Sequence, residues 1–571
     1  MAIADSSDPT EHDHPSSSSA AAAARLAPRR KRVWKANKIF RNQLKFIGPG
    51  IVAAVAYCDP GNWATDLEAG STFGYAHLFV ILSASMMAIV LQVLATRLGY
   101  VTGKDLAQHC RARFYDRPTH TKLWRWACLY PLYAVCEAGI IFTDLAELLG
   151  SAIALKMLIP RLPLWVGVLL TSTDVFIVLA FFNSYPEISS RSRRSMHIFE
   201  FSVSILVLIV LVSFIVLIVN VQPDWGDTFR GYLPSRTMIV NGGLYLAVSI
   251  VGATVMPHSI FLGSKVAISD RLKPSPMEDK ETQLGRSPDP STSPNLSPIQ
   301  QSGDLPSLQI ARAAGLRLHQ TSPVNDYVSS VEHCKAHLAH ASFDVAISLF
   351  TLALPINSAI LIVAAAAFYY SGSDGPSQVA DLASAHQLLT SRVGVGSGYI
   401  FAIALLVAGQ AASITVTLAG QIVSEGFIEW RTRPFVRRLV TRLIGIVPSA
   451  IVAASVGPQG VDDLLIGSQV ALSMVLPFVV LPLIIFTSDP QTMTMPNYHS
   501  LPSGSPIGSP TTTHPTKPPG ENENEGSLAL MSSNESTFEN NLATKIIVGL
   551  IFCICCVANV YAIVQLAQGR T

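Results

Sequence analysis

Long apolar stretches, separated by charged or Ser- and Pro-rich segments, dominate the chain. A helix needs roughly 20 apolar residues to cross the hydrocarbon of a bilayer. Eleven stretches approach that length, and they are centred near residues 55, 86, 143, 171, 210, 253, 356, 413, 449, 475 and 555. The pattern predicts an all-α polytopic membrane protein with eleven transmembrane helices.

The basic residues predict an orientation. Lys and Arg are abundant ahead of the first apolar stretch, and they recur in every second connection, for example in RSRRSMH and EWRTRPFVRRLVTR. Cytoplasmic loops of membrane proteins carry this excess. We therefore expect a cytoplasmic N-terminus and, with an odd number of helices, a short outer C-terminal tail. The sequence does not distinguish between the plasma, vacuolar and endosomal membranes as the location of the protein.

Composition narrows the class of protein. Of 571 residues, 49% are apolar and 14% charged, and the net charge is +2. This balance is typical of a membrane protein and offers no basic field to attract nucleic acid. The chain has neither a nucleophile arrangement nor an HExxH motif, so no enzyme is expected.

The polar segments predict the domain boundaries. They are rich in Ser, Pro, Thr, Asn and charge and cannot bury a core, so we interpret them as disordered. Trafficking or ubiquitin-ligase partners could bind the cytoplasmic loops. The expected order is a disordered cytoplasmic tail (1–37), helices 1–6 (38–268), a disordered cytoplasmic loop (269–335), helices 7–10 (336–488), a second such loop (489–540), and helix 11 with its outer tail (541–571).

The first apolar stretch is interrupted by AYCDPGNWATD. An Asp inside the membrane is functional by default and needs a partner nearby. Pro60 and Gly61 break the helix, and a broken helix is tolerated where its freed carbonyls line a cavity or bind an ion. Asp59, Asn62 and the carbonyl of Ala56 therefore make a candidate set of oxygen ligands.

The sixth stretch is interrupted in a similar way, in VGATVMPHSIFLGS. Pro257 frees the carbonyl of Ala253, Met256 adds a thioether, and His258 adds an imidazole. A sulfur ligand suits d-block metals and not Na⁺, Mg²⁺ or Ca²⁺. Taken alone, the Met could be packing and the His a core residue. Paired breaks in helices 1 and 6 favour a transporter built from two inverted five-helix repeats.

The third stretch carries Glu137, Asp144 and Glu147. At 100° per residue these carboxylates lie within about 80° of one another on one helix face. If these carboxylates faced lipid, the free-energy cost of burying their charge would be prohibitive. We therefore expect them to face protein or water.

Three motifs together resemble a known family. DPGN followed by WATDLEAGSTFGY, then MPH, then AGQAASITVTLAGQIVSEGF, are similar to the Nramp (natural resistance-associated macrophage protein) family of proton-coupled divalent metal transporters, in its fungal form. The resemblance implies a leucine-transporter-like fold and transport of Mn²⁺ or Fe²⁺ with H⁺, without a resident cofactor. The metal ligands it implies are the side chains of Asp59, Asn62, Met256 and Gln469 and the carbonyls of Ala56 and Ala253.

The resemblance also implies a proton route. It runs along Glu147, Asp144 and Glu137, with Arg438 and Arg442 of the ninth stretch as candidate basic partners. The arginines could instead be membrane-surface anchors, with Arg437 an equal candidate. His258 could pass a proton or orient the second break.

Two other functions remain alternatives. A metal sensor or scaffold could signal through the cytoplasmic loops, although the full set of ligand types argues against it. A Na⁺-coupled organic-solute symporter would share the architecture, but Met256 contributes nothing to such a site.

Overall fold

The computed structural model describes residues 43, 48–115, 117–181, 190–239, 242–268, 331–370, 382–429, 434–455, 458–496 and 535–568. Apart from one short strand pair, its elements are helical. In chain order they are α2 (Pro49–Val55), α3 (Pro60–Phe73), η1 (Gly74–His77), α4 (Leu78–Thr102), α5 (Leu106–Phe114), α6 (Thr121–Trp124), η2 (Arg125–Leu129), α7 (Tyr130–Leu158), α8 (Leu164–Phe181), α9 (Ser190–Val221), α10 (Trp225–Arg230), η3 (Arg236–Ile239), α11 (Gly243–Thr254), α12 (Pro257–Val266), α15 (Val331–Ser348), η5 (Leu349–Ala353), α16 (Leu354–Ala364), η6 (Ala365–Tyr369), α17 (Leu382–Arg392), α18 (Val395–Ile428), α19 (Pro434–Ser455), α20 (Pro458–Ser488), β1 (Thr494–Pro496), β2 (Glu535–Thr537) and α22 (Leu542–Ala567).

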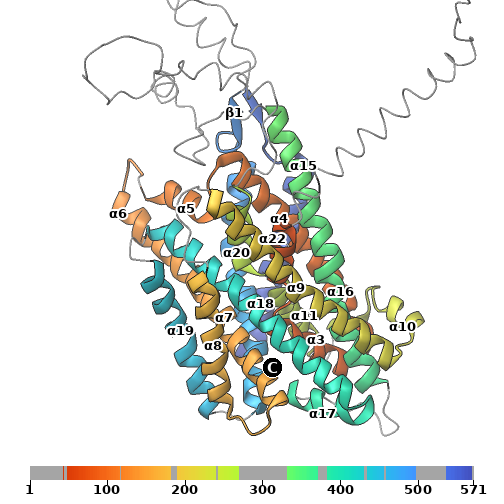
Figure 1. Ribbon diagram of the computed structural model, residues 1–571. Coiled ribbons are helices and arrows are strands. Elements are labelled where there is room, and N and C mark those ends of the chain that lie inside the picture. Colours follow the sequence, from red (N-terminus) through yellow and green to blue (C-terminus); the bar gives the residue numbers. More distant parts are fainter. Residues whose placement is uncertain are drawn as a thin grey trace, which may run out of the picture.

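The long helices lie alongside one another in one bundle, with the strand pair at one end and α17 at the other (Figure 1). α7 packs along α18 and α20, while α9 and α22 keep many apolar side chains exposed. An apolar surface of this kind is stable against lipid and not against water. The fold is that of an integral, multi-span membrane protein.

Within the described ranges, eight helical stretches are long and apolar enough to cross a membrane. One of them, 60–102, contains α3, η1 and α4 and so covers the second part of predicted helix 1 together with predicted helix 2. Two shorter apolar helices lie at Leu164–Thr173 and Leu443–Ser455, where helices 4 and 9 are expected. The number eleven stays a prediction.

Helix α5 joins the ends of α4 and α12. Asp105 caps α5 through a capping box with Gln108, and its carboxylate forms an ion pair with Lys265 of α12 at 3.2 Å. The backbone N–H of Leu106 donates to Ser264 Oγ at 3.1 Å. Burial raises the pKa of Asp105 even though Lys265 lowers it. This end of α12 is therefore fastened to α5.

The predicted loop 489–540 is ordered at both ends. Strands β1 and β2 pair antiparallel there, and the backbone N–H of Phe538 donates to the carbonyl of Met493 at 2.8 Å. Met493 is fully buried. The prediction of disorder was wrong for these ends, because composition does not reveal a short strand pair that closes over an apolar side chain. Helix α15 likewise begins at Val331, inside the predicted loop 269–335.

The other predictions of disorder, for 1–37 and for the remaining parts of the two loops, lie outside the described residues.

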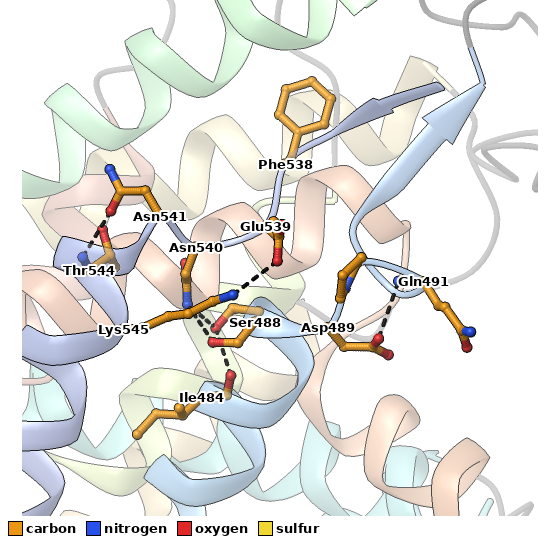
Figure 2. A network of polar contacts seen from close by, with 12 residues as sticks. Ile484, Ser488, Asp489, Gln491, Phe538, Glu539, Asn540, Asn541, Thr544 and Lys545 are labelled. Carbon is orange, nitrogen blue, oxygen red and sulfur yellow. Dashed lines mark hydrogen bonds and ion pairs between the residues drawn. The ribbon is translucent and has the colours of Figure 1, made fainter. Parts of the chain in front are cut away.

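A polar network fixes the second end of that loop to the bundle (Figure 2). The amide of Asn540 donates to Thr487 Oγ1 at 2.8 Å and to Ser488 Oγ at 3.2 Å. Arg97 of α4 donates to the carbonyl of Phe538 at 2.6 Å and to Asn540 Oδ1 at 3.2 Å. The network therefore joins α4, the end of α20 and the start of α22.

Replacing Asn540 with alanine is expected to lower stability by about 2 kcal/mol, because several buried polar groups lose their partners. The melting temperature in detergent would fall accordingly. The matched control is Gln491→Ala, since Gln491 is exposed, and we expect it to change stability by less than about 0.5 kcal/mol. Equal effects of the two substitutions would contradict this account of the network.

Candidate metal centre

The first interruption is the start of a helix. α2 ends at Val55, α3 begins at Pro60, and Asp59 is the N-cap of α3. The Asp59 carboxylate accepts hydrogen bonds from the backbone N–H groups of Gly61 and Asn62, each at 3.2 Å. Asp is a preferred N-cap, and Pro suits the first helical position because the N–H that it lacks has no helical partner there. The sequence DPGN therefore ends one helix and begins the next.

The second interruption has the same form. α11 ends at Thr254, α12 begins at Pro257, and Met256 is the N-cap, without a side-chain cap bond. In both places the Pro has no N–H to give to the carbonyl four residues earlier. The carbonyls left without this helical donor belong to Ala56 and Ala253, the two expected backbone ligands.

Two sets of contacts bring the interruptions together. Gln469 of α20 touches both: a methyl group at Gly61 would overlap its Nε2, and one at Gly252 would overlap its backbone oxygen. Ser259, just after the second interruption, donates through Oγ to the hydroxyl of Tyr57, in the first, at 2.8 Å. The two helix starts are therefore neighbours in the middle of the bundle.

Several ligand atoms at this point have no partner of their own. Asn62 donates through Nδ2 to the carbonyl of Tyr57 at 2.8 Å, and Gln469 donates through Nε2 to Ser468 Oγ at 3.2 Å. In the described part of the chain, Asn62 Oδ1 and Gln469 Oε1 accept no hydrogen bond. Buried oxygens without donors are the arrangement that a cation satisfies. The four side chains Asp59, Asn62, Met256 and Gln469 are each at most 1% exposed.

The chemistry of this set is mixed. It combines a carboxylate, amide and backbone oxygens and one thioether, whereas hard cations such as Mg²⁺ and Ca²⁺ are bound by oxygen alone. Among the described residues, no group of three or more His, Cys, Asp and Glu side chains could hold a metal. The mixed ligand atoms are therefore better suited to a divalent transition metal than to Mg²⁺ or Ca²⁺.

Sequence reasoning missed the residues that support this site. Asn357 of α16 donates through Nδ2 to the carbonyl of Tyr57 at 3.0 Å, and Tyr57 donates through its hydroxyl to Gln92 Oε1 at 3.3 Å. The signal for Asn357 was an amide within the apolar run LPINSAILIV. Nothing in the sequence indicates that its partner is a backbone carbonyl.

His258 lies one residue beyond Pro257 and is only 2% exposed. Neither ring nitrogen has a hydrogen-bond partner in the described part of the chain. Among the described residues, the imidazole therefore makes no hydrogen bond that would orient the second interruption.

Glu147 of α7 lies close to the first interruption. A methyl group at Gly150, one turn later, would overlap Pro60. Glu147 itself is fully buried and lies within electrostatic reach of Asp59, and neither of its carboxylate oxygens has a partner among the described residues. A buried acid without a partner beside the candidate site can receive or release a proton.

The other two acids of α7 meet different neighbours. Asp144 is buried against α19, since a methyl group at Gly445 would overlap its carboxylate. Glu137 is half-buried and pairs with Tyr133 of its own helix. Arg438 and Arg442 belong to α19, but their side chains lie outside the described residues.

Comparison with known proteins gives a consistent picture. A family model described as "Natural resistance-associated macrophage protein-like" matches residues 50–287 and 313–500. The chain is 42% identical over 455 residues to the manganese transporter pdt1 of Schizosaccharomyces pombe, covering 79% of this chain and 76% of the relative. It is 39% identical over 458 residues to the iron transporter SMF3 of Saccharomyces cerevisiae, covering 80% of this chain and 84% of the relative.

A solved structure is also similar to this chain. The crystal structure of the Eremococcus coleocola manganese transporter, in complex with an aromatic bis-isothiourea substituted compound, matches with a TM-score of 0.62 at 27% identity, covering 92% of this chain and 87% of that one.

Proposed function

Because the chain belongs to the Nramp family and transports divalent metal ions of the Mn²⁺ and Fe²⁺ class, we propose that it is a proton symporter that carries these ions into the cytosol by alternating access. It is a transporter and not an enzyme. Its substrates are the metal ion and H⁺, and its surroundings are the lipid bilayer.

The observation that carries the proposal is the meeting of two helix starts at Gln469. The cargo is held there by the carboxylate of Asp59, the amide oxygens of Asn62 and Gln469, the sulfur of Met256, and the carbonyls of Ala56 and Ala253. Unwound backbone at such breaks supplies cation ligands in transporters. The thioether disfavours Mg²⁺ and Ca²⁺ relative to Mn²⁺, Fe²⁺ and Cd²⁺.

The proposed architecture has eleven membrane helices, the first ten in two inverted five-helix repeats. Helices 1 (α2 and α3) and 6 (α11 and α12) move against a scaffold that includes α7, α18 and α19. Close packing supports this arrangement, since methyl groups at Gly150 of α7 and Gly409 of α18 would both crowd Pro60. A rigid partner on one side of α3 favours motion of the broken helix as a unit.

Proton coupling follows from the charges beside the metal. A dication that arrives at Asp59 attracts its carboxylate and favours release of its proton. Glu147 is the nearest step of the proposed route, followed by Asp144 and Glu137 along α7. His258 is a further candidate for passing the proton. The proposed orientation has the N-terminus and both long loops in the cytosol, where trafficking or ubiquitin-ligase partners could reach the loops.

The substitution Glu147→Gln tests the route. In proteoliposomes we expect Mn²⁺ uptake to continue within about tenfold of wild type, while metal-driven proton flux falls by at least about tenfold. The matched control is Glu429→Gln, because Glu429 is half exposed and paired with Arg111. If Glu147→Gln keeps its proton flux while Asp59→Asn loses metal uptake, α7 does not carry the proton.

A further inference from the structure

Helix α3 holds a second buried carboxylate that the proposed transport cycle does not use. Asp66 is 1% exposed, and neither of its oxygens has a hydrogen-bond partner among the described residues. It follows Asp59 by seven residues, so it lies within about 20° of the same helix face and about 10 Å farther along the axis. A buried ionised carboxylate without a partner is unfavourable by several kcal/mol, so Asp66 is neutralised either by a proton or by a cation beside it.

The contacts of α3 tell which neighbour Asp66 faces. One turn after Asp66, Gly70 lies against the carbonyl of Leu361 of α16, at a distance that leaves no room for a methyl group. α3 and α16 run in the same direction, because α2 contacts α15 and η5 whereas α3 contacts α16 and η6. One turn before Leu361 is Asn357. Asp66 and Asn357 are thus both one turn before the closest contact, on the faces that the two helices turn toward each other.

Asn357 supplies a matching oxygen. It is fully buried, and its Nδ2 is committed to the carbonyl of Tyr57 at 3.0 Å. The bond fixes the amide so that Oδ1 is the free end, and Oδ1 has no partner among the described residues. The interface between α3 and α16 therefore contains three buried acceptor oxygens, and none of them accepts a hydrogen bond in the described part of the chain.

We propose that the interface between α3 and α16 is a second cation site, formed by the carboxylate of Asp66 and Oδ1 of Asn357. The ligand atoms are all oxygen. The site therefore takes a hard cation of the Na⁺ or Ca²⁺ class and has no preference for the transition metals that Met256 binds at the first site. The bound cation neutralises Asp66 and connects α3 to α16. The proposal does not depend on the proposed transport function, since it uses none of the proposed metal ligands of the first site; Asn357 touches that site only through the carbonyl of Tyr57.

The test is equilibrium binding of ⁴⁵Ca²⁺ and of ²²Na⁺, in separate arms, to the purified full-length protein, with choline chloride holding the ionic strength constant. We expect one cation to bind saturably to wild type and equally to Asp59→Ala, and Asp66→Asn to weaken that binding at least tenfold. The matched control is Glu68→Gln, which removes a carboxylate from the same helix about 200° away from Asp66. It is expected to bind as wild type does.

Three results would overturn the proposal: no saturable binding of either cation to wild type, unchanged binding in Asp66→Asn, or loss of binding in Asp59→Ala alone. Size-exclusion chromatography establishes that each variant is folded. If Asp66→Asn is not monodisperse, Asp66→Ser replaces it, with the same expected loss. Mn²⁺ uptake by wild type is measured on the same preparation, so a failure of the second site and a failure of transport are separate results.

Discussion

Replacing Asp59 with asparagine is expected to reduce Mn²⁺ binding and uptake by at least about 100-fold. Removal of one partner from a buried, charge-paired site costs about 3–5 kcal/mol, and each 1.4 kcal/mol corresponds to roughly tenfold in affinity. Asparagine caps a helix about as well as aspartate, so the two backbone hydrogen bonds that start α3 can persist. The variant thus removes the charge and keeps the helix start. Equilibrium binding of ⁵⁴Mn²⁺ and vesicle uptake measure the two quantities.

Asp59→Ala completes the comparison. It removes both the charge and the cap, so it should lose about 1 kcal/mol more stability than Asp59→Asn while showing the same loss of Mn²⁺ binding. If Asp59→Asn takes up Mn²⁺ within tenfold of wild type, the carboxylate is not a metal ligand and serves only to cap α3.

Replacing Met256 with alanine is expected to change selectivity more than rate. Without the thioether, the metal ion is bound by oxygen atoms alone, so the site should no longer discriminate against hard cations. We expect the ratio of Cd²⁺ or Mn²⁺ to Ca²⁺ uptake to fall by at least about tenfold, which corresponds to roughly 1.4 kcal/mol. Competition between ⁵⁴Mn²⁺ and unlabelled Ca²⁺ in proteoliposomes measures that ratio.

The control for Met256 is Met157→Ala. Met157 is also buried, at 8% exposure, and lies near the end of α7. Met157→Ala removes the same side-chain volume and the same sulfur atom as Met256→Ala, so any general effect of weaker packing appears in both variants. An unchanged metal ratio in Met256→Ala would show that this sulfur only packs.

The helix interruptions could be predicted from sequence because their cause is local. Pro60 and Pro257 remove one hydrogen bond each, at a known distance along the chain, and so identify Ala56 and Ala253. Local reasoning did not predict that each interruption is the start of a new helix. Asp59 and Met256 are the N-caps of α3 and α12.

The partners of the site were harder to predict. Gln469 came only from family resemblance, because no periodicity connects it to Gly61 or to Gly252. Asn357 was missed because its partner is the backbone of Tyr57, 300 residues away. Such a bond depends on how the helices are assembled, and a single sequence does not encode it as a pattern.

The acids of α7 show the limit of periodicity. Spacing predicts that Glu137, Asp144 and Glu147 share one face, but it does not reveal what each of them meets. Asp144 lies against Gly445 of α19, whereas Glu137 pairs within its own helix. The ordered end of the second loop was missed for the same reason, because Arg97 binds it across 441 residues.

The central claim is that one site holds the metal and releases the proton. The direct test is Mn²⁺ uptake into proteoliposomes of the purified full-length protein, with lumenal pH recorded in the same vesicles and no ATP present. The account predicts uptake accompanied by acidification of the lumen, both lost in Asp59→Asn. Uptake of Mn²⁺ with no change in lumenal pH would contradict proton coupling, and no uptake of Mn²⁺, Fe²⁺ or Cd²⁺ by folded protein would contradict transport itself.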